Sequence, residues 1–158
     1  MTGLRKRYIF AATAIGLIGL LVMSGGVAVA GHKIQDTGSG TVTLDRENGA
    51  PEQASGTAKF TLTDETEGFH TVKVTIKVKD LLRKSGNVYE AWLRDNQTDF
   101  DHPLKTFQTD DDGDRSTSVT TSVPHFAEYD EVLVTTERKH DENPTRNGTV
   151  VLRGKLAH

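Results

Sequence analysis

The feature that most constrains the fold is the strict alternation of apolar and polar residues in the segment 71–79. Its sequence, TVKVTIKVK, has β-branched apolar residues at positions 72, 74, 76 and 78 and polar residues between them. In an extended strand these four side chains share one face, whereas in a helix they would be scattered around the circumference. The segment therefore predicts a β-strand with one face against a core.

Seven further segments have the same short, alternating character: 40–44, 57–63, 87–94, 104–109, 116–123, 131–138 and 149–156. Gly, Pro, Asn and Asp cluster between them, as turns require. No stretch of ten residues has a 3.6-residue apolar period, and we expect at most a short helical turn at 80–84. Eight short strands without crossover helices predict an antiparallel, immunoglobulin-like β-sandwich over residues 40–158.

The first thirty residues are typical of an export signal. Arg5, Lys6 and Arg7 precede an apolar run from 8 to 23, which ends in Ser-Gly-Gly and the triplet Ala-Val-Ala at 28–30. We predict a signal peptide over 1–30 and a flexible leader over 31–39. An uncleaved membrane anchor over 8–30 is the alternative, since about 20 apolar residues span a bilayer. Either way, the basic N-terminus predicts that the remaining chain is secreted or otherwise extracytoplasmic.

Composition narrows the possible chemistry. Residues 31–158 keep 16 of the 19 basic side chains and all 22 acidic ones, a formal charge of −6, so we expect no nucleic-acid partner. The absence of cysteine excludes disulfides, thiolate metal sites and a cysteine nucleophile. The six histidines show no H-x-H or H-x-x-x-H pair, and there is no G-x-S-x-G motif. We expect a non-enzymatic protein without a cofactor.

The segment 88–93, Val-Tyr-Glu-Ala-Trp-Leu, opens an ordered series of strand and turn elements. The later members are Leu-Lys-Thr-Phe at 104–107, Asp-Gly at 112–113, Val-Leu-Val-Thr-Thr-Glu at 132–137, Pro-Thr at 144–145 and Val-Leu-Arg-Gly-Lys-Leu at 151–156. In this order they resemble the outward-facing C-terminal domain of the anti-sigma-K factor family, over residues 55–156. The resemblance implies a sandwich outside the membrane that acts as a sensor or interaction module and has no established catalytic residues.

One difference from that family limits what the resemblance implies. Family members carry a helical sigma-binding domain on the cytoplasmic side of their single span, whereas only residues 1–7 precede the apolar run here. Seven residues are too few for a folded domain. We therefore expect no sigma binding by this chain itself, unless a separate protein supplies the inner half.

Trp92 and a row of lysines are the first binding candidates. Trp92 is the single tryptophan, and we expect it to pack inside the sandwich, with stacking on a glycan as the alternative. Lys73, Lys77 and Lys79 share the polar face of the segment 71–79. We expect them to keep the open face of the strand solvated or to guard a strand edge against pairing with another chain; binding of anionic envelope polymers or lipid headgroups is the alternative.

Asp110, Asp112 and Asp114 form a weak candidate for calcium. Gln108 occupies the first ligand position of the pattern D-x-[DN]-x-[DN]-G, so we expect a solvated Asp-Gly turn instead. Asp99 and Asp101 would lie at the opposite end of the intervening strand.

Together, the export signal, the strand pattern and the family resemblance predict an envelope module for protein interaction or sensing, whose partner is an unknown envelope protein. The alternative is a domain that binds a small ligand, either a glycan or calcium.

Overall fold

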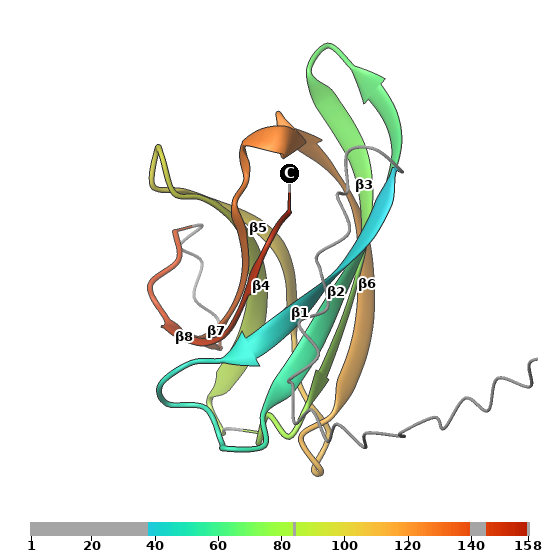
Figure 1. Cartoon of the computed structure of the whole chain (residues 1–158). Coiled ribbons are helices and arrows are strands. Elements are labelled where there is room, and N and C mark those ends of the chain that lie inside the picture. The colour runs from blue at the N-terminus through green and yellow to red at the C-terminus, as the bar shows by residue number, and fades with distance from the viewer. Residues whose placement is uncertain (1–37, 84, 140–144, 158) are drawn as a thin grey trace, which may run out of the picture.

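The computed structural model describes residues 38–83, 85–139 and 145–157 (Figure 1). This part of the chain is built almost entirely of β-strands. The elements are β1 (Ser39–Arg46), β2 (Ser55–Thr66), β3 (Phe69–Lys79), β4 (Asn87–Asp95), β5 (Phe100–Phe107), β6 (Arg115–Pro124), the 3-10 turn η1 (Phe126–Glu128), β7 (Glu131–Arg138) and β8 (Thr149–Lys155).

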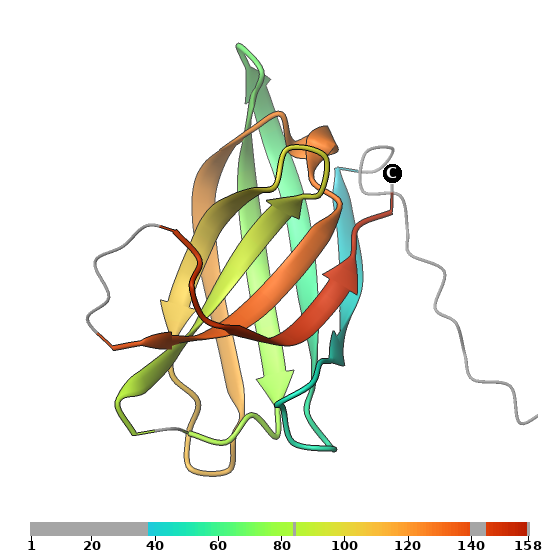
Figure 2. The ribbon, with the colours of Figure 1, turned by 90° about the vertical axis from the view of Figure 1, so that its left-hand side faces the viewer.

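All neighbouring strands are antiparallel, in the order β5-β4-β7-β8-β1-β2-β3-β6. The sheet bends at β1, because residues 39–44 pair with β2 while Asp45 and Arg46 pair with β8. We call β1, β2, β3 and β6 half-sheet A, and β4, β5, β7 and β8 half-sheet B. The two ends of the order, β5 and β6, approach each other, so the sheet nearly closes into a barrel (Figures 1 and 2).

The core lies between the two half-sheets. Val72, Val74, Ile76 and Val78 are all buried there, as the alternation of the segment 71–79 predicts. Burying each such side chain contributes about 1.5 to 3 kcal/mol. The sheet is therefore held mainly by apolar packing, without help from disulfides.

The antiparallel, all-β character is confirmed, and each of the eight predicted segments contains a strand. The boundaries of β5 differ: it begins at Phe100 and runs through Pro103, which an edge strand tolerates because it needs no donor on its open side. The predicted helical turn is wrong for residues 80–83, where the backbone amide of Leu81 instead donates to Gly113 O, 2.9 Å away. The turn η1 was not predicted, because three residues show no periodicity.

Two further predictions concern segments outside the described residues. The signal peptide or anchor of 1–30 lies there, as do residues 31–37 of the leader. Within the described ranges, no helix has the length and apolarity needed to cross a membrane. β1 starts at Ser39, one residue before the predicted beginning of the domain.

The connections separate into two ends of the molecule. Those joining β1 to β2, β3 to β4 and β5 to β6 share one end, at the bottom of Figure 2. We call this the distal end. The start of β1 lies at the opposite, proximal end, together with the β2–β3 hairpin and the β4–β5 connection.

Candidate functional site

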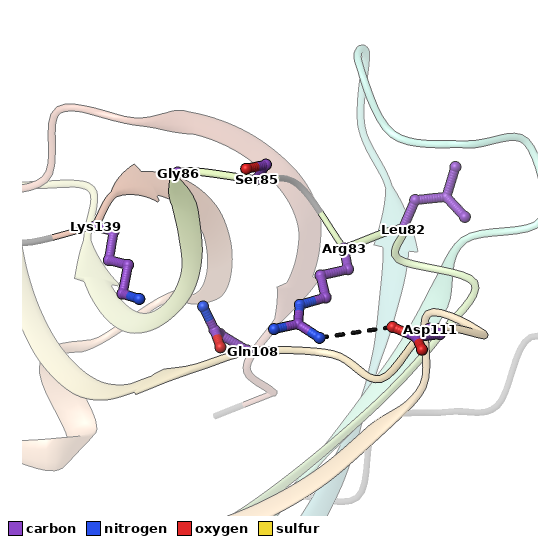
Figure 3. A pocket seen from close by; sticks show the side chains of 7 residues that line it. All are labelled: Leu82, Arg83, Ser85, Gly86, Gln108, Asp111 and Lys139. Atoms are coloured by element: carbon purple, nitrogen blue, oxygen red, sulfur yellow. Dashed lines mark ion pairs between the residues drawn. The ribbon is translucent and has the colours of Figure 1, made fainter.

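A groove of about 600 Å³ lies at the distal end (Figure 3). Its walls come from the β3–β4 connection, the β5–β6 connection and the end of β7. They include Leu82, Arg83, Ser85, Gln108, Asp111 and Lys139. The groove thus combines segments that are far apart in the sequence.

Backbone hydrogen bonds hold these walls together. The amide of Asp80 donates to Asp114 Oδ1 at 3.2 Å, and the amide of Lys139 donates to Gly86 O at 2.9 Å. Gly113 has φ +90°, and a Cβ there would lie 2.9 Å from the Leu81 nitrogen. The β5–β6 turn therefore needs glycine at this position to lie against the β3–β4 connection.

The groove has a mixed chemical character. Arg83 Nη1 lies 3.5 Å from Asp111 Oδ1, and both side chains are mostly exposed, so this ion pair contributes little stability. In Figure 3 the side chains of Lys139, Gln108 and Arg83 follow one another along the groove. Leu82 is an apolar neighbour that is 57% exposed. Among the described lining residues, Ser85 has no histidine beside it.

A smaller apolar cavity of about 300 Å³ adjoins the groove. Its lining includes Ala50, Pro51, Leu81, Leu82, Tyr89 and Val151. The hydroxyl of Tyr89 donates to Leu82 O at 2.7 Å, which fixes the wall shared by the two hollows. Burial also raises the pKa of Tyr89, so this phenol stays neutral.

Trp92 lies on the outer face of half-sheet B and outside the core between the half-sheets. Its side chain is 1% exposed. Nε1 donates to Thr135 Oγ1 at 2.9 Å, and that hydroxyl in turn donates to Glu137 Oε1 at 2.5 Å. The ring is therefore a packing group here and is not open to a stacking sugar.

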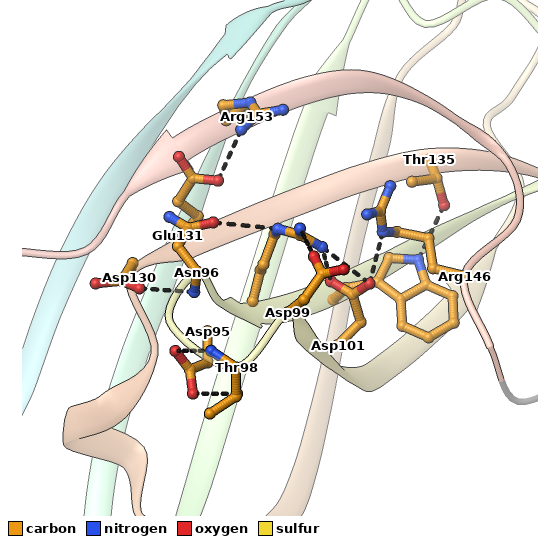
Figure 4. Close-up of polar contacts among 12 residues, drawn as sticks. Asp95, Asn96, Thr98, Asp99, Asp101, Asp130, Glu131, Thr135, Arg146 and Arg153 are labelled. Atoms are coloured by element: carbon orange, nitrogen blue, oxygen red, sulfur yellow. Dashed lines mark hydrogen bonds and ion pairs between the residues drawn. The ribbon is translucent and has the colours of Figure 1, made fainter.

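Asp101 joins two cations beside this buried region (Figure 4). Its Oδ1 accepts a hydrogen bond from Arg94 Nη1 at 3.1 Å, and its Oδ2 accepts one from Arg146 Nε at 2.9 Å. Arg94 also contacts Asp99. Arg146 thereby holds the β7–β8 connection against β5. We call Arg94, Asp99, Asp101 and Arg146 the ion-pair clamp.

Two other carboxylates near this clamp have structural partners. Glu131 Oε2 accepts from Arg153 Nη1 at 2.7 Å, which links β7 to β8. Asp95 accepts a hydrogen bond from the Thr98 hydroxyl (Figure 4) and one from the Gln97 amide. These bonds lower the pKa of its carboxyl. Sequence reasoning missed this whole network, because nothing in the local sequence marks which strands become neighbours.

The acidic turn is also occupied by its own hydrogen bonds. Asp110 Oδ1 accepts from the Asp114 amide at 2.8 Å, Asp114 binds the Asp80 amide, and Asp112 is exposed. Among the described residues there is no group of three or more His, Cys, Asp or Glu side chains placed to hold a metal. Residues 140–144, which follow Lys139, lie outside that part of the chain.

Lys73, Lys77 and Lys79 are exposed on the outer face of half-sheet A. The register of the sheet adds Lys59 from β2, which lies opposite Thr75 between Lys73 and Lys77. Lys59 was not among the predicted candidates, because cross-strand register cannot be read from one strand alone. The lysine row is thus a cluster of four cations on two strands.

Comparison with known proteins gives no relative for this arrangement. No protein-family model, curated protein or solved structure matches the chain. The function must therefore be argued from the surfaces described above.

Proposed function

We propose that this protein is an exported, non-enzymatic module that binds another envelope protein through the distal groove. The observation that carries the proposal is the exposed Leu82 beside the groove's charged and polar residues. An apolar anchor within a polar rim is the usual anatomy of a protein interface. The hydrogen-bonded walls support the proposal, because a preformed groove loses little conformational freedom on binding.

The position of the groove supports its role at the envelope. The chain enters the domain at Ser39, at the proximal end. A domain tethered through residues 8–30, the predicted anchor, would present the distal end away from the membrane. A secreted form without the tether would expose the same end. In the anchored form, residues 8–30 are the only membrane contact that the proposal requires.

The resemblance to anti-sigma-K outer domains supports an interaction or sensing role for the same module. An immunoglobulin-like relationship is proposed at the level of architecture, since the two half-sheets face each other across one core. The strand order is a difference: constant-type immunoglobulin sheets place the first, second, fifth and fourth strands together, whereas half-sheet A holds β1, β2, β3 and β6.

Site-specific photo-crosslinking tests the proposal. A photoreactive amino acid at Leu82 is compared with the same group at Phe100, which is 51% exposed but lies at the proximal end. We expect a discrete protein adduct from intact cells at position 82, absent at position 100 and lost when Arg83→Glu is added. Adducts of equal yield at both positions, or none at position 82, would contradict the proposal.

The apolar cavity favours a second candidate function, the binding of a small ligand. A volume of about 300 Å³ is at the lower limit for ligand sites, and barrel mouths are common locations for them. A thermal-shift screen with oligosaccharides, calcium and small apolar compounds tests this idea. We expect any stabilising compound to lose its effect in Ala50→Phe, which fills the cavity from its rim; a flat response from the whole screen counts against the candidate.

A further inference from the structure

The outer face of half-sheet A has an unusually uniform composition. Within residues 39–44, 57–63, 71–79 and 116–122, every outward position holds Ser, Thr or Lys. We call these outward residues the lysine–hydroxyl face. Asp45 is the next outward residue along β1, but it belongs to the pairing with β8. The face therefore carries four positive charges and no negative one.

The sheet register surrounds each lysine with hydroxyl groups. Lys73 lies opposite Thr61 on one side and Thr120 on the other, and Lys77 lies between Thr57 and Ser116. From Lys73 to Lys77 the strand spans about 13 Å, and from Lys77 to Lys79 about 7 Å. The cations thus form an elongated row, with hydrogen-bonding groups on both sides.

A hollow lies at one end of the lysine row, and this observation does not depend on the sheet register. This hollow of about 420 Å³ is lined by Lys77, Lys79 and Arg115, together with Asp110 and Asp114. Asp110 and Asp114 each accept a backbone amide hydrogen bond within the neighbouring turn. The hollow therefore adds Arg115 as a fifth cation at one end of the row, next to two carboxylates that are engaged in the turn.

We propose that the lysine–hydroxyl face binds a linear acidic polysaccharide whose chain runs along β3. Charge complementarity carries the proposal, because residues 31–158 have a net charge of −6 while this face is purely cationic. Repeating carboxylates can meet the lysine row, and the sugar hydroxyls can exchange hydrogen bonds with the Ser and Thr side chains. The proposal rests on the extracytoplasmic location proposed above and is independent of the distal groove.

Other polyanions fit this face less well. Single-stranded nucleic acid is held by successive bases stacked on aromatic side chains. Within the ranges of the face the outward positions include none, and Phe69, 49% exposed beyond Thr71 on β3, supplies a single ring at its proximal end. Peripheral membrane binding gains strength from several apolar side chains inserted among the lipids, whereas this side of β3 adds only Phe69, beyond the end of the lysine row. An acidic glycan needs only charges and hydroxyl groups.

Alginate oligosaccharides, with neutral dextran for comparison, provide the test. The double variant Lys73→Gln/Lys77→Gln is compared with Lys105→Gln/Lys155→Gln, which removes two exposed lysines from half-sheet B. We expect the wild type to bind alginate in preference to dextran, with an affinity that falls as salt rises. The first double variant should bind about tenfold more weakly. The second should stay within about twofold of the wild type.

Several results would overturn the proposal: no binding of alginate at millimolar concentration, equal binding of dextran, equal weakening by both double variants, or stronger binding to phosphatidylglycerol vesicles than to alginate. Far-UV circular dichroism and a thermal melt verify that each variant is folded. Leu82→Asp should bind alginate as the wild type does, because Leu82 lies in the distal groove. Failure of the groove proposal is therefore distinguishable from failure of this one.

Discussion

The outer faces of the two half-sheets differ sharply, although their strands have similar alternating sequences. On half-sheet A the outward side chains are exposed or half-buried, and the lysines of β3 are exposed. On half-sheet B the outward Leu133, Thr135 and Glu137 are buried. Strand alternation therefore identifies the face that meets the core, but it does not tell whether the other face is open.

The connections explain this difference. β2 and β3 are joined by a two-residue turn at Glu67 and Gly68, which is too short to cover any neighbour. The β7–β8 connection is longer and returns Arg146 to β5. Gly148 lies against the Thr136 carbonyl and the Glu137 carboxylate, a contact that leaves no room for a Cβ. One half-sheet thereby has a second buried layer, and the other keeps an open surface.

The largest expected effect is on the covered face. Trp92→Ala removes a buried ring and leaves the Thr135 hydroxyl without its indole donor. We expect the free energy of unfolding to fall by about 3 to 5 kcal/mol, measured by urea denaturation. A loss below about 1 kcal/mol would show that the covered face is not a true second core.

The next effect concerns the clamp on the same face. Asp101→Ala leaves the largely buried Arg94 and Arg146 without their shared carboxylate. We expect a loss of about 2 to 3 kcal/mol. Arg146→Ala is the control and should cost less, because Asp101 keeps its bond to Arg94; the reverse order would contradict the assigned geometry.

A smaller effect should appear on the acid side of the pH profile. Burial lowers the pKa of His102 below its ordinary 6.5, and its ring meets that of Tyr129 edge-on. Because the pKa of His102 is lower in the folded state than in the unfolded state, the neutral ring contributes fully to stability above pH 6.5. That contribution is lost as the pH falls through the folded-state pKa. We expect the unfolding free energy of His102→Phe to decline less steeply below pH 6.5 than that of the wild type. Parallel curves would count against a half-buried histidine that is kept neutral.

The smallest expected effect is on the open face. Thr75 exchanges one exposed hydrogen bond with Ser118, 2.8 Å away. Thr75→Ala should change the unfolding free energy by no more than about 0.5 kcal/mol. A change as large as that of Trp92→Ala would remove the contrast between the two faces.

These comparisons show how much the sequence could predict. Strict alternation identified β3 and its buried valines, and turn residues separated all eight strands. The partners of Trp92 and the position of Lys59 were not predictable, because both depend on the register and order of strands that are distant in the sequence. The distal groove was equally hidden, since two connections and the end of β7 must meet to form it.

The most direct test of the contrast between the faces is an NMR titration of the isotope-labelled protein with alginate oligosaccharides. If the open face binds and the covered face is structural, amide shifts will change along β2, β3 and β6 around Lys59, Lys73 and Lys77. The amides around Trp92 and Leu133 will stay unchanged. Shift changes confined to β4 and β7, or spread evenly over both half-sheets, would contradict this account.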